Sequence, residues 1–578
     1  MNTKYTHEGY ETFMNHSKMA VNMYIHLILF CMLMQLSFIG IEVYLSMTGY
    51  EIRVIFKWIF AKIMITLIPG MHLRFMNPDG SIIQTTAFTI AHAPNLNRFI
   101  HAHLDEFMTI LLDSCLFYLF FPLFLMFFKY RALHQSAKKN IGGIKLIQPD
   151  ELKKQMRKHH DTGDLCLGSV NMPINSENRH TFSIGRPGVG KTCLNMKILE
   201  RLIERNERIL IYDFKGDYCE AFYNPKRGHQ IFNPLDARSL HWNIFNDIHT
   251  HMDIDAVASS LIPSQSSTLE PFWHDAARDV FSGILHFLYE HNFRTNQDIW
   301  KIVTSDRTVI EENLKGTQCG KRALRYLGEE NAKQAQSILA VMMQFGKCFE
   351  YMAEMHGDFS IKRWLESDAN CIFITSNADV QDTLRPILSL FIDLIGRKLL
   401  SMPDNYASKT FILLDEFGTL QRLTSIISLL TLSRSKNGSC FISIQDYGQI
   451  DETYSKNVRQ TIINSCGTKV LFSVGDVDTA NISSKLIGES EFVRMDKSVS
   501  MGVSDVKDGT SLSFNQKKEL LLSASEIMNL PDLHCVVKFP NYNPVISTLT
   551  YKKFTKNGSA FQIREDLLLN KAYKPASQ

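Results

Sequence analysis

One short segment of the chain has the residue types and the spacing that bind a polyphosphate. Gly185–Thr192 reads GRPGVGKT, which matches the G-x-x-x-x-G-K-[ST] pattern, and it lies between a short apolar run and a helical pattern. Its glycines let backbone N–H groups curl around phosphates at the start of a helix. Lys191 neutralises the β- and γ-phosphate oxygens, and the Thr192 hydroxyl ligates Mg²⁺. The sequence therefore predicts a site for ATP and Mg²⁺ on the loop residues Gly185, Arg186, Pro187, Gly188, Val189, Gly190, Lys191, Thr192 and Cys193.

A second segment, Phe411–Glu416 (FILLDE), places two acids directly after four apolar residues. Such a run predicts a buried strand whose carboxyl end lies on the ligand side of an open sheet. We expect this strand beside the one that precedes Gly185, with Asp415 holding Mg²⁺ and Glu416 orienting or deprotonating the attacking water. More than two hundred residues separate Lys191 from Asp415, which exceeds a minimal nucleotide-binding core and indicates an inserted domain.

Two further strand ends carry polar residues. Ser439–Gln445 (SCFISIQ) finishes on an amide. Gln445 either senses the γ-phosphate or hydrogen-bonds the attacking water, or it is simply the end of a strand. Asp213 and Asp217 flank the end of the run that begins ILIYD, where they either assist the nucleotide and Mg²⁺ or cap the strand.

Arg434 is the candidate for a residue that acts on a neighbouring subunit. The stretch Thr419–Arg434 is predicted as a helix that carries the guanidinium away from the chain's own phosphate site. In a ring of subunits that direction leads to the neighbour's site, where an arginine finger raises the rate by about 10³ to 10⁵. Lys436 is an alternative to Arg434, and plain surface charge is another reading of both residues.

The elements that position these residues follow an alternating pattern. From Gln148 onward, strand-like apolar runs alternate with helical patterns, which predicts an α/β fold with a parallel sheet and helices on both of its faces. The stretch Asp253–Trp364 has helical periodicity and few β-branched runs, so we predict an all-helical insertion there. From Tyr551 the chain carries six Lys or Arg residues against two acids, and we expect a mobile basic tail.

The N-terminal quarter of the chain is membrane-like. Met23–Ile41 is almost wholly apolar, and no charged residue lies between Lys18 and Glu42, so this stretch is long enough for a membrane-spanning helix. A cleaved signal peptide is the alternative, but no small-residue cleavage site follows. Met108–Phe128 predicts a second span, and basic residues crowd behind it, which marks the cytoplasmic side. Both termini are therefore expected in the cytoplasm.

Two features near these spans keep alternative interpretations. Ile52–Leu67 is apolar but contains Arg53, Lys57 and Lys62, so we interpret it as an interfacial helix rather than a third span. An acid inside a span is energetically costly, so Asp113 is either a functional residue or, because it lies about one turn into its span, one whose side chain reaches the headgroups.

Composition excludes several classes of protein. Hydrophobic residues make up 45% of the chain and charged residues 21%, which excludes a disordered chain. The net charge of +3 excludes a protein held to nucleic acid by bulk charge. Eleven cysteines without paired spacing exclude a disulfide scaffold, and the histidines show no metal-ligand spacing.

Together these motifs resemble the type IV secretion coupling proteins, in particular the TraD-like branch of conjugative plasmids and integrative elements. The resemblance extends from the N-terminal spans to about Leu549. Besides the nucleotide motifs, it rests on five segments, which are Ile231–Phe245, Ser260–Phe281, Phe373–Ser389, Leu414–Leu420 and Leu522–Pro544.

The resemblance implies a RecA-like motor ATPase that forms a homo-hexameric ring on the bacterial inner membrane. Such proteins bring the relaxase and its nicked single-stranded DNA to the secretion channel. The family positions fall on Lys191, Thr192, Asp415 and Glu416, with Arg434 at the finger. Some relatives carry a long acidic C-terminal extension that docks the relaxosome, and this chain departs from that pattern.

The expected fold class is therefore α/β: a RecA-like P-loop NTPase domain with an inserted all-α domain, preceded by a two-helix transmembrane anchor. The expected boundaries are a cytoplasmic N-terminus 1–20, a span 21–45, a periplasmic loop 46–106, a span 107–128, nucleotide-binding parts 129–251 and 366–550 around a helical insertion 252–365, and a basic tail 551–578. The expected function is a motor that delivers the relaxase–DNA complex. A substrate receptor whose ATP binding controls assembly, and a chromosome-partitioning translocase, are the alternatives.

Overall fold

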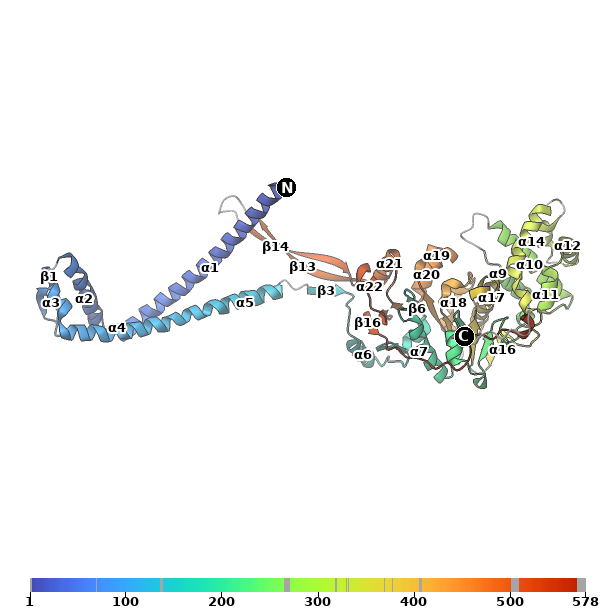
Figure 1. Cartoon of the computed structure of the whole chain (residues 1–578), viewed down its shortest axis with the longest axis horizontal. Coiled ribbons are helices and arrows are strands. Elements are labelled where there is room, and N and C mark those ends of the chain that lie inside the picture. The colour runs from blue at the N-terminus through green and yellow to red at the C-terminus, as the bar shows by residue number, and fades with distance from the viewer. Residues whose placement is uncertain are drawn as a thin grey trace. The chain divides into compact units, whose positions relative to one another are not determined.

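The computed structural model describes residues 3–68, 70–135, 139–264, 271–317, 320–328, 330, 332–367, 370–376, 378–404, 408–500 and 509–568 (Figure 1). The chain forms two compact units. The first is drawn from residues 1–139 and 494–515, and the second from residues 140–493 and 516–578. Every cysteine among the described residues is free.

Helices dominate the first unit. Two helical segments in the described part of the chain, Val21–Ser46 and Pro94–Phe127, are long and apolar enough to cross a membrane. They contact each other through Gln35, whose amide donates to Ser114 Oγ at 3.1 Å and whose Oε1 accepts from the Tyr118 hydroxyl at 3.0 Å. The elements are α1 (Thr3–Ser46), α2 (Gly49–Leu67), β1 (His72–Met76), β2 (Ile82–Thr86), α3 (Ala87–His92), α4 (Pro94–Ser114), η1 (Cys115–Leu119) and α5 (Phe120–Gln135).

The second unit is built on a nine-stranded sheet in the order β16-β15-β12-β6-β11-β10-β7-β9-β8. Neighbours from β12 to β8 are parallel, whereas β15 and β16 add an antiparallel edge. The strands are β6 (Thr181–Ile184), β7 (Arg208–Asp213), β8 (Gln230–Phe232), β9 (Cys371–Thr375), β10 (Thr410–Leu414), β11 (Gly438–Ile444), β12 (Thr468–Leu471), β15 (His534–Lys538) and β16 (Val545–Thr548). This arrangement confirms the predicted α/β fold with a parallel sheet.

One predicted neighbour relationship is wrong. The sequence predicts that the strand before Asp415 lies beside the strand that precedes Gly185, but β11 lies between β10 and β6. In the register, Ile444 of β11 pairs with Ile184 on one side, and Ile442 of β11 pairs with Leu414 on the other. The strand that ends before Gln445 is therefore central to the site.

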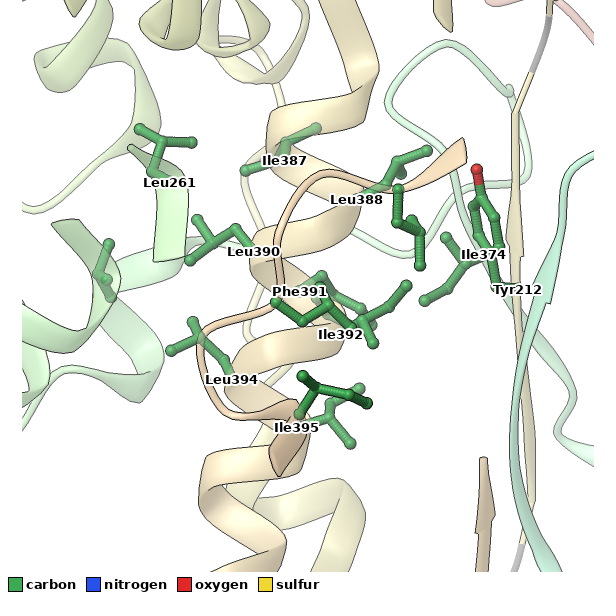
Figure 2. Packing of buried hydrophobic residues seen from close by; sticks show 14 of the residues in the cluster. Tyr212, Leu261, Ile374, Ile387, Leu388, Leu390, Phe391, Ile392, Leu394 and Ile395 are labelled. Carbon is green, nitrogen blue, oxygen red and sulfur yellow. The ribbon is translucent and has the colours of Figure 1, made fainter. Parts of the chain in front are cut away.

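Helices cover both faces of the sheet because its strands alternate their side chains. On one face α7 (Lys191–Glu204) buries Leu194 and Ile198 in a cluster with Ile209 and Phe411. On the other face α17 (Gln381–Leu400) buries apolar residues around its circumference, including Phe391. Figure 2 shows α17 with the strand residues Ile374 and Tyr212 on one side and Leu261 on the other.

Between β8 and β9 the chain forms a series of helices without a strand in its described part, as predicted for the insertion. Four of these helices, α10, α11, α12 and α14, gather into one group (Figure 1). The helices are α9 (His251–Leu261), α10 (Phe272–Glu290), α11 (Asn296–Val303), α12 (Arg307–Lys315), α13 (Lys321–Leu327), α14 (Ala332–Gly346), α15 (Cys348–Met352) and α16 (Ile361–Glu366).

The remaining elements complete the chain. They are β3 (Lys139–Gly143), α6 (Pro149–Lys158), β4 (Cys166–Leu167), β5 (Val170–Asn171), η2 (Ile174–Arg179), α8 (Asp217–Phe222), η3 (Pro225–Arg227), η4 (Ile244–Asp247), η6 (Ala378–Val380), η7 (Phe417–Thr419), α18 (Ile426–Leu432), η8 (Ser433–Lys436), α19 (Tyr447–Thr453), α20 (Lys456–Ser465), α21 (Val477–Ile487), β13 (Glu489–Ser500), β14 (Gly509–Leu520), α22 (Ala524–Met528) and η9 (Glu565–Leu567).

The predicted helix over Thr419–Arg434 is wrong in its first half. The chain is irregular from Leu420 to Ser425, and α18 begins only at Ile426. Side chains from elsewhere in the chain accept hydrogen bonds from the backbone N–H groups of this stretch. Leu423 N–H donates to the Tyr454 hydroxyl at 2.8 Å, and Ser425 N–H donates to Asp393 Oδ1 at 2.7 Å. Because these donors already have partners, no helix is needed to satisfy them.

The prediction of a mobile tail is wrong for residues 551–568. The backbone N–H of Asn557 donates to Glu220 O at 2.7 Å, and that of Ala237 donates to Gln562 O at 2.7 Å. Further along, the Arg564 guanidinium donates to Tyr351 O at 2.7 Å. These contacts fix the segment along the second unit, and residues 569–578 lie outside the described part of the chain.

Candidate nucleotide site

Four parallel strands of the sheet end at one edge. β6, β11, β10 and β7 are consecutive neighbours, and their registers align Ile184 with Ile444 and Leu414 with Tyr212. The residues at or directly after these strand ends are Gly185, Gln445, Asp415 and Asp213. The fold therefore brings together groups that are more than two hundred residues apart in the sequence.

The glycine-rich loop is shaped by its neighbours. A Cβ added to Gly185 would lie 2.5 Å from Phe472 Cβ, so only glycine fits against β12. Gly188 and Gly190 have φ values of 83° and 114°, in the left-handed region that glycine adopts without strain. The same added atom at Gly188 meets nothing within 4 Å, which leaves space at the crest of the loop.

Lys191 is the first residue of α7, and its side chain is buried under the loop. Its ammonium group donates to the carbonyl oxygens of Gly185 and Arg186. Burial lowers the pKa of Lys191, whereas the nearby carboxylates of Glu416 and Asp415 act in the opposite direction. The lysine therefore lies within electrostatic reach of both acids.

The Asp415 carboxylate is held on both of its oxygens. Oδ2 accepts from the Tyr218 hydroxyl at 3.0 Å, and Oδ1 accepts from the Asn195 amide at 3.3 Å. Burial, and then the neighbouring Glu416 carboxylate, raise the pKa of Asp415 to about 6. A bound cation at this position would favour the ionised form.

Glu416 is fixed by Gln445. The Gln445 amide donates to Glu416 Oε1 at 2.9 Å and to Oε2 at 2.8 Å. Glu416 is buried and has a φ of 56°, an uncommon backbone conformation for a residue other than glycine. Residues held in such strained conformations cluster at active sites and ligand-binding sites.

Asp213 has the geometry of a capping residue, one of the two interpretations that the sequence left open. Its carboxylate accepts from the backbone N–H groups of Gly216 at 2.9 Å and Cys219 at 2.8 Å. Burial raises the pKa of Asp213 to about 8. Asp217, by contrast, is exposed at the start of α8.

The structure also places the other residues of the predicted phosphate-binding loop. Val189 is buried, and its carbonyl accepts from Leu533 N–H at 2.9 Å. Arg186 pairs with Asp532 at 2.8 Å, and Cys193 Sγ contacts Thr550 O at 3.8 Å, so these two side chains bind the protein itself. Pro187 lines a pocket beside Gln445, and Thr192 is half-buried.

Arg434 is not part of this cluster. It precedes β11, whereas Gln445 follows the strand, and β11 itself has 7 residues, which span roughly 23 Å of extended chain. Arg434 is exposed and makes no side-chain hydrogen bond or ion pair in the described part of the chain. The neighbouring Lys436 pairs with Asp404 at 2.7 Å.

The sequence interpretation missed Asn195 and Tyr218. A signal for Asn195 was available, because it lies four residues after Lys191 and so on the same face of the helix. Tyr218 has no comparable signal, since its contact with Asp415 depends on the pairing of β7 with β10.

In the described part of the chain, no cluster of three or more His, Cys, Asp or Glu side chains suits a metal ion. Any Mg²⁺ here would rely on Thr192, Asp415 and the nucleotide itself, a donor set of oxygens that fits this ion.

Comparisons with known proteins add to this geometry. A family model described as type IV secretion-system coupling protein DNA-binding domain matches residues 164–550. Coupling protein TraD of Escherichia coli (strain K12) is 28% identical over 442 residues, which cover 75% of this chain and 61% of TraD. Protein VirD4 of Rhizobium radiobacter is 25% identical over 399 residues, which cover 63% of this chain and 57% of VirD4. The chain thus spans about three-fifths of the length of these relatives.

Solved structures include similar chains. The bacterial conjugative coupling protein TrwB, in an unbound form, superposes with a TM-score of 0.66 at 25% identity, covering 74% of this chain and 97% of that one. TrwB has also been solved with the non-hydrolysable ATP analogue ADPNP and with ADP and Mg²⁺. Each of these complexes has a TM-score of 0.65 at 25% identity, and the match covers 74% of this chain and 98% of the solved TrwB chain.

Proposed function

This chain belongs to the family of type IV secretion-system coupling proteins, and from that premise we propose its function. It is a membrane-anchored ATPase that delivers a relaxase-bound DNA strand to a conjugative secretion channel. One observation carries the proposal: Lys191, Asp415 and Glu416 meet at one sheet edge. The same chain contains two helical segments apolar enough to span a membrane. A membrane-tethered motor requires both features.

ATP and Mg²⁺ are the cofactors that the site supports. The related TrwB binds an ATP analogue in one structure and ADP with Mg²⁺ in another. In this chain, Lys191 and the loop backbone would hold the phosphates, and Thr192 and Asp415 would hold the metal. The bound Mg²⁺ supplies charge neutralisation of the phosphate oxygens.

Glu416 is the residue that would prepare the attacking water. Phosphoryl transfer depends mainly on positioning and electrostatics, so a fixed carboxylate serves better than a mobile one. Gln445 holds that carboxylate through both of its oxygens. We assign Glu416 the task of orienting the water and receiving its proton, and Gln445 the task of fixing Glu416.

Arg434 would act on a neighbouring subunit. It lies on the amino-terminal side of β11, away from the strand ends that form its own chain's site. A guanidinium at that distance does not reach its own phosphates. An exposed arginine fits the role of a finger across the interface of a homo-hexameric ring.

The anchor would place the ATPase on the cytoplasmic side of the bacterial inner membrane. Basic residues follow the second apolar segment closely, namely Lys129, Arg131, Lys138, Lys139 and Lys145. Such a bias marks the cytoplasmic end of a span. With two spans, both termini lie in the cytoplasm and the intervening loop lies in the periplasm.

The alternative is a substrate receptor whose ATP binding controls assembly. The two functions differ in whether DNA accelerates hydrolysis. ATP turnover by the purified full chain, with and without single-stranded DNA at low salt, distinguishes them, since phosphate contacts are strongest there. We expect DNA to raise turnover; hydrolysis that DNA leaves unchanged favours the receptor.

A further inference from the structure

The carboxylate of Asp415 is oriented by two side chains that the nucleotide motifs do not contain. Tyr218 comes from α8 and Asn195 from α7, and each donates one hydrogen bond to a different oxygen of Asp415. A carboxylate oxygen has two lone-pair sites, so each oxygen keeps one for a further partner. The carboxylate is therefore held in place and remains able to bind a cation or its water.

Tyr218 is held rigidly in this position. Only 2% of its surface is exposed, so its ring is locked by packing. The turn that precedes it is fixed because Asp213 accepts from the backbone N–H groups of Gly216 and Cys219. The strand end of β7 thus determines where the Tyr218 hydroxyl points.

Asn195 is fixed by a separate set of contacts. Its amide nitrogen also donates to Ser443 Oγ at 3.0 Å. Ser443 in turn shares a hydrogen bond of 2.7 Å with Ser183 across the β11–β6 pair. All three side chains are buried, so this polar chain links the helix after the phosphate loop to the acid of β10.

We propose that Tyr218 and Asn195 are positioning residues that aim the Asp415 carboxylate at the Mg²⁺ of the bound nucleotide. The inference rests on the proposed function, because it concerns the same site. Partners that hydrogen-bond a metal-ligating carboxylate set its orientation, and their loss typically costs roughly 10- to 100-fold in metal affinity. Tyr218→Phe and Asn195→Leu therefore weaken Mg²⁺ binding while the phosphate loop stays intact.

The test is equilibrium binding of a fluorescent ADP to the full chain in detergent, titrated with MgCl₂. In both variants the half-saturating Mg²⁺ concentration rises roughly tenfold or more. The affinity for nucleotide without Mg²⁺ stays within about twofold of wild type, because the side-chain hydrogen bonds of Tyr218 and Asn195 go to Asp415 and Ser443 and not to the phosphate loop. A residue that merely supports the fold would change both affinities together.

Tyr212→Phe is the matched control. Tyr212 is also a buried tyrosine, six residues earlier on β7, and its hydroxyl bonds Thr419 Oγ1 at 2.9 Å instead of an acid. This variant is expected to keep the wild-type Mg²⁺ dependence. If Tyr218→Phe does not fold, Asn195→Leu alone decides the question.

The experiment distinguishes failure of the proposed nucleotide site from failure of the positioning role alone. If nucleotide binding by wild type does not depend on Mg²⁺, or if Asp415→Asn binds Mg²⁺ as well as wild type, the proposed site itself is wrong. If wild type and Asp415→Asn behave as expected but Tyr218→Phe and Asn195→Leu match Tyr212→Phe, only the positioning role is overturned.

Discussion

The side-chain amide of Gln445 donates to both carboxylate oxygens of Glu416, at 2.9 and 2.8 Å. The two residues follow neighbouring strands, β11 and β10, so sheet pairing sets the contact. Glu416 adopts a left-handed backbone conformation there, with a φ of 56°. Such a conformation costs about 1 to 3 kcal/mol, and the surrounding contacts must offset it. The pair therefore defines a fixed position for the Glu416 carboxylate, to which we assign the orientation of the attacking water.

Glu416→Gln is expected to lower the kcat of ATP hydrolysis by about 10² to 10⁴, because the variant loses a positioned base. Nucleotide affinity should remain, since Lys191 and the loop are unchanged. Turnover and equilibrium binding, measured on the same preparation, check the prediction. Glu354→Gln alters an exposed glutamate of the helical insertion and serves as the control. Wild-type turnover in Glu416→Gln would remove this residue from the mechanism.

Gln445→Leu is expected to lower kcat by about tenfold, because a hydrogen bond to a charged group contributes about 1.5 to 3 kcal/mol and here it orients the base. Gln445→Glu should be more harmful, since it places a second carboxylate against Glu416. Steady-state kinetics of both variants check the order. Equal activity of the Leu and Glu variants would contradict an orienting contact.

Mixed rings test Arg434. Lys191→Ala subunits and Arg434→Ala subunits should each be inactive alone, and a mixture should regain ATPase activity, because some interfaces then combine an intact loop with an intact guanidinium. Lys436→Ala is the matched control, since Lys436 is already paired with Asp404 at 2.7 Å and should stay active alone. An absence of recovery in rings shown to be mixed argues against action across the interface.

The sequence predicts those site residues whose position depends only on their neighbours in the chain. The loop Gly185–Thr192 and the acids after β10 and β7 follow apolar runs, so their place at strand ends could be predicted. The neighbour order could not, because it depends on which strands pair. As a result the position of β11 between β6 and β10 was missed, and with it the contact between Gln445 and Glu416.

Two other errors have the same origin in contacts distant in sequence. Helical periodicity after Thr419 is overridden because Tyr454 and Asp393 accept the backbone N–H groups of the segment. The basic composition after Tyr551 suggests a solvated tail. Backbone bonds such as that of Asn557 to Glu220 hold the segment instead, and composition cannot reveal them.

His180 makes stability depend on pH. It is buried before β6, its Nδ1 accepts from Cys440 N–H at 3.0 Å, and burial lowers its pKa to about 4. An unfolded histidine has a pKa of about 6.5 and so takes up its proton first on acidification. The stability that buried, neutral His180 contributes is therefore fully present above about pH 6.5 and is lost as the pH falls towards 4. At pH 5 the free energy of unfolding has fallen by about 2 kcal/mol through this group.

His180→Asn keeps an acceptor for Cys440 without a titrating ring. Its free energy of unfolding should fall less steeply than that of wild type between pH 6.5 and 4, which thermal or denaturant unfolding at several pH values measures. His249→Asn changes an exposed histidine and should keep the wild-type slope. Parallel curves for wild type and His180→Asn would contradict the assignment.

The most direct test of the central claim is equilibrium binding of a non-hydrolysable ATP analogue with Mg²⁺ to the purified full chain, with Lys191→Ala in parallel. If the loop after β6 and the acids after β10 form one nucleotide site, wild type binds one analogue per chain. Lys191→Ala then loses at least tenfold in affinity, because it lacks the charge that neutralises the phosphates. Saturable binding that is identical in the two proteins, or no binding by wild type, would contradict the account.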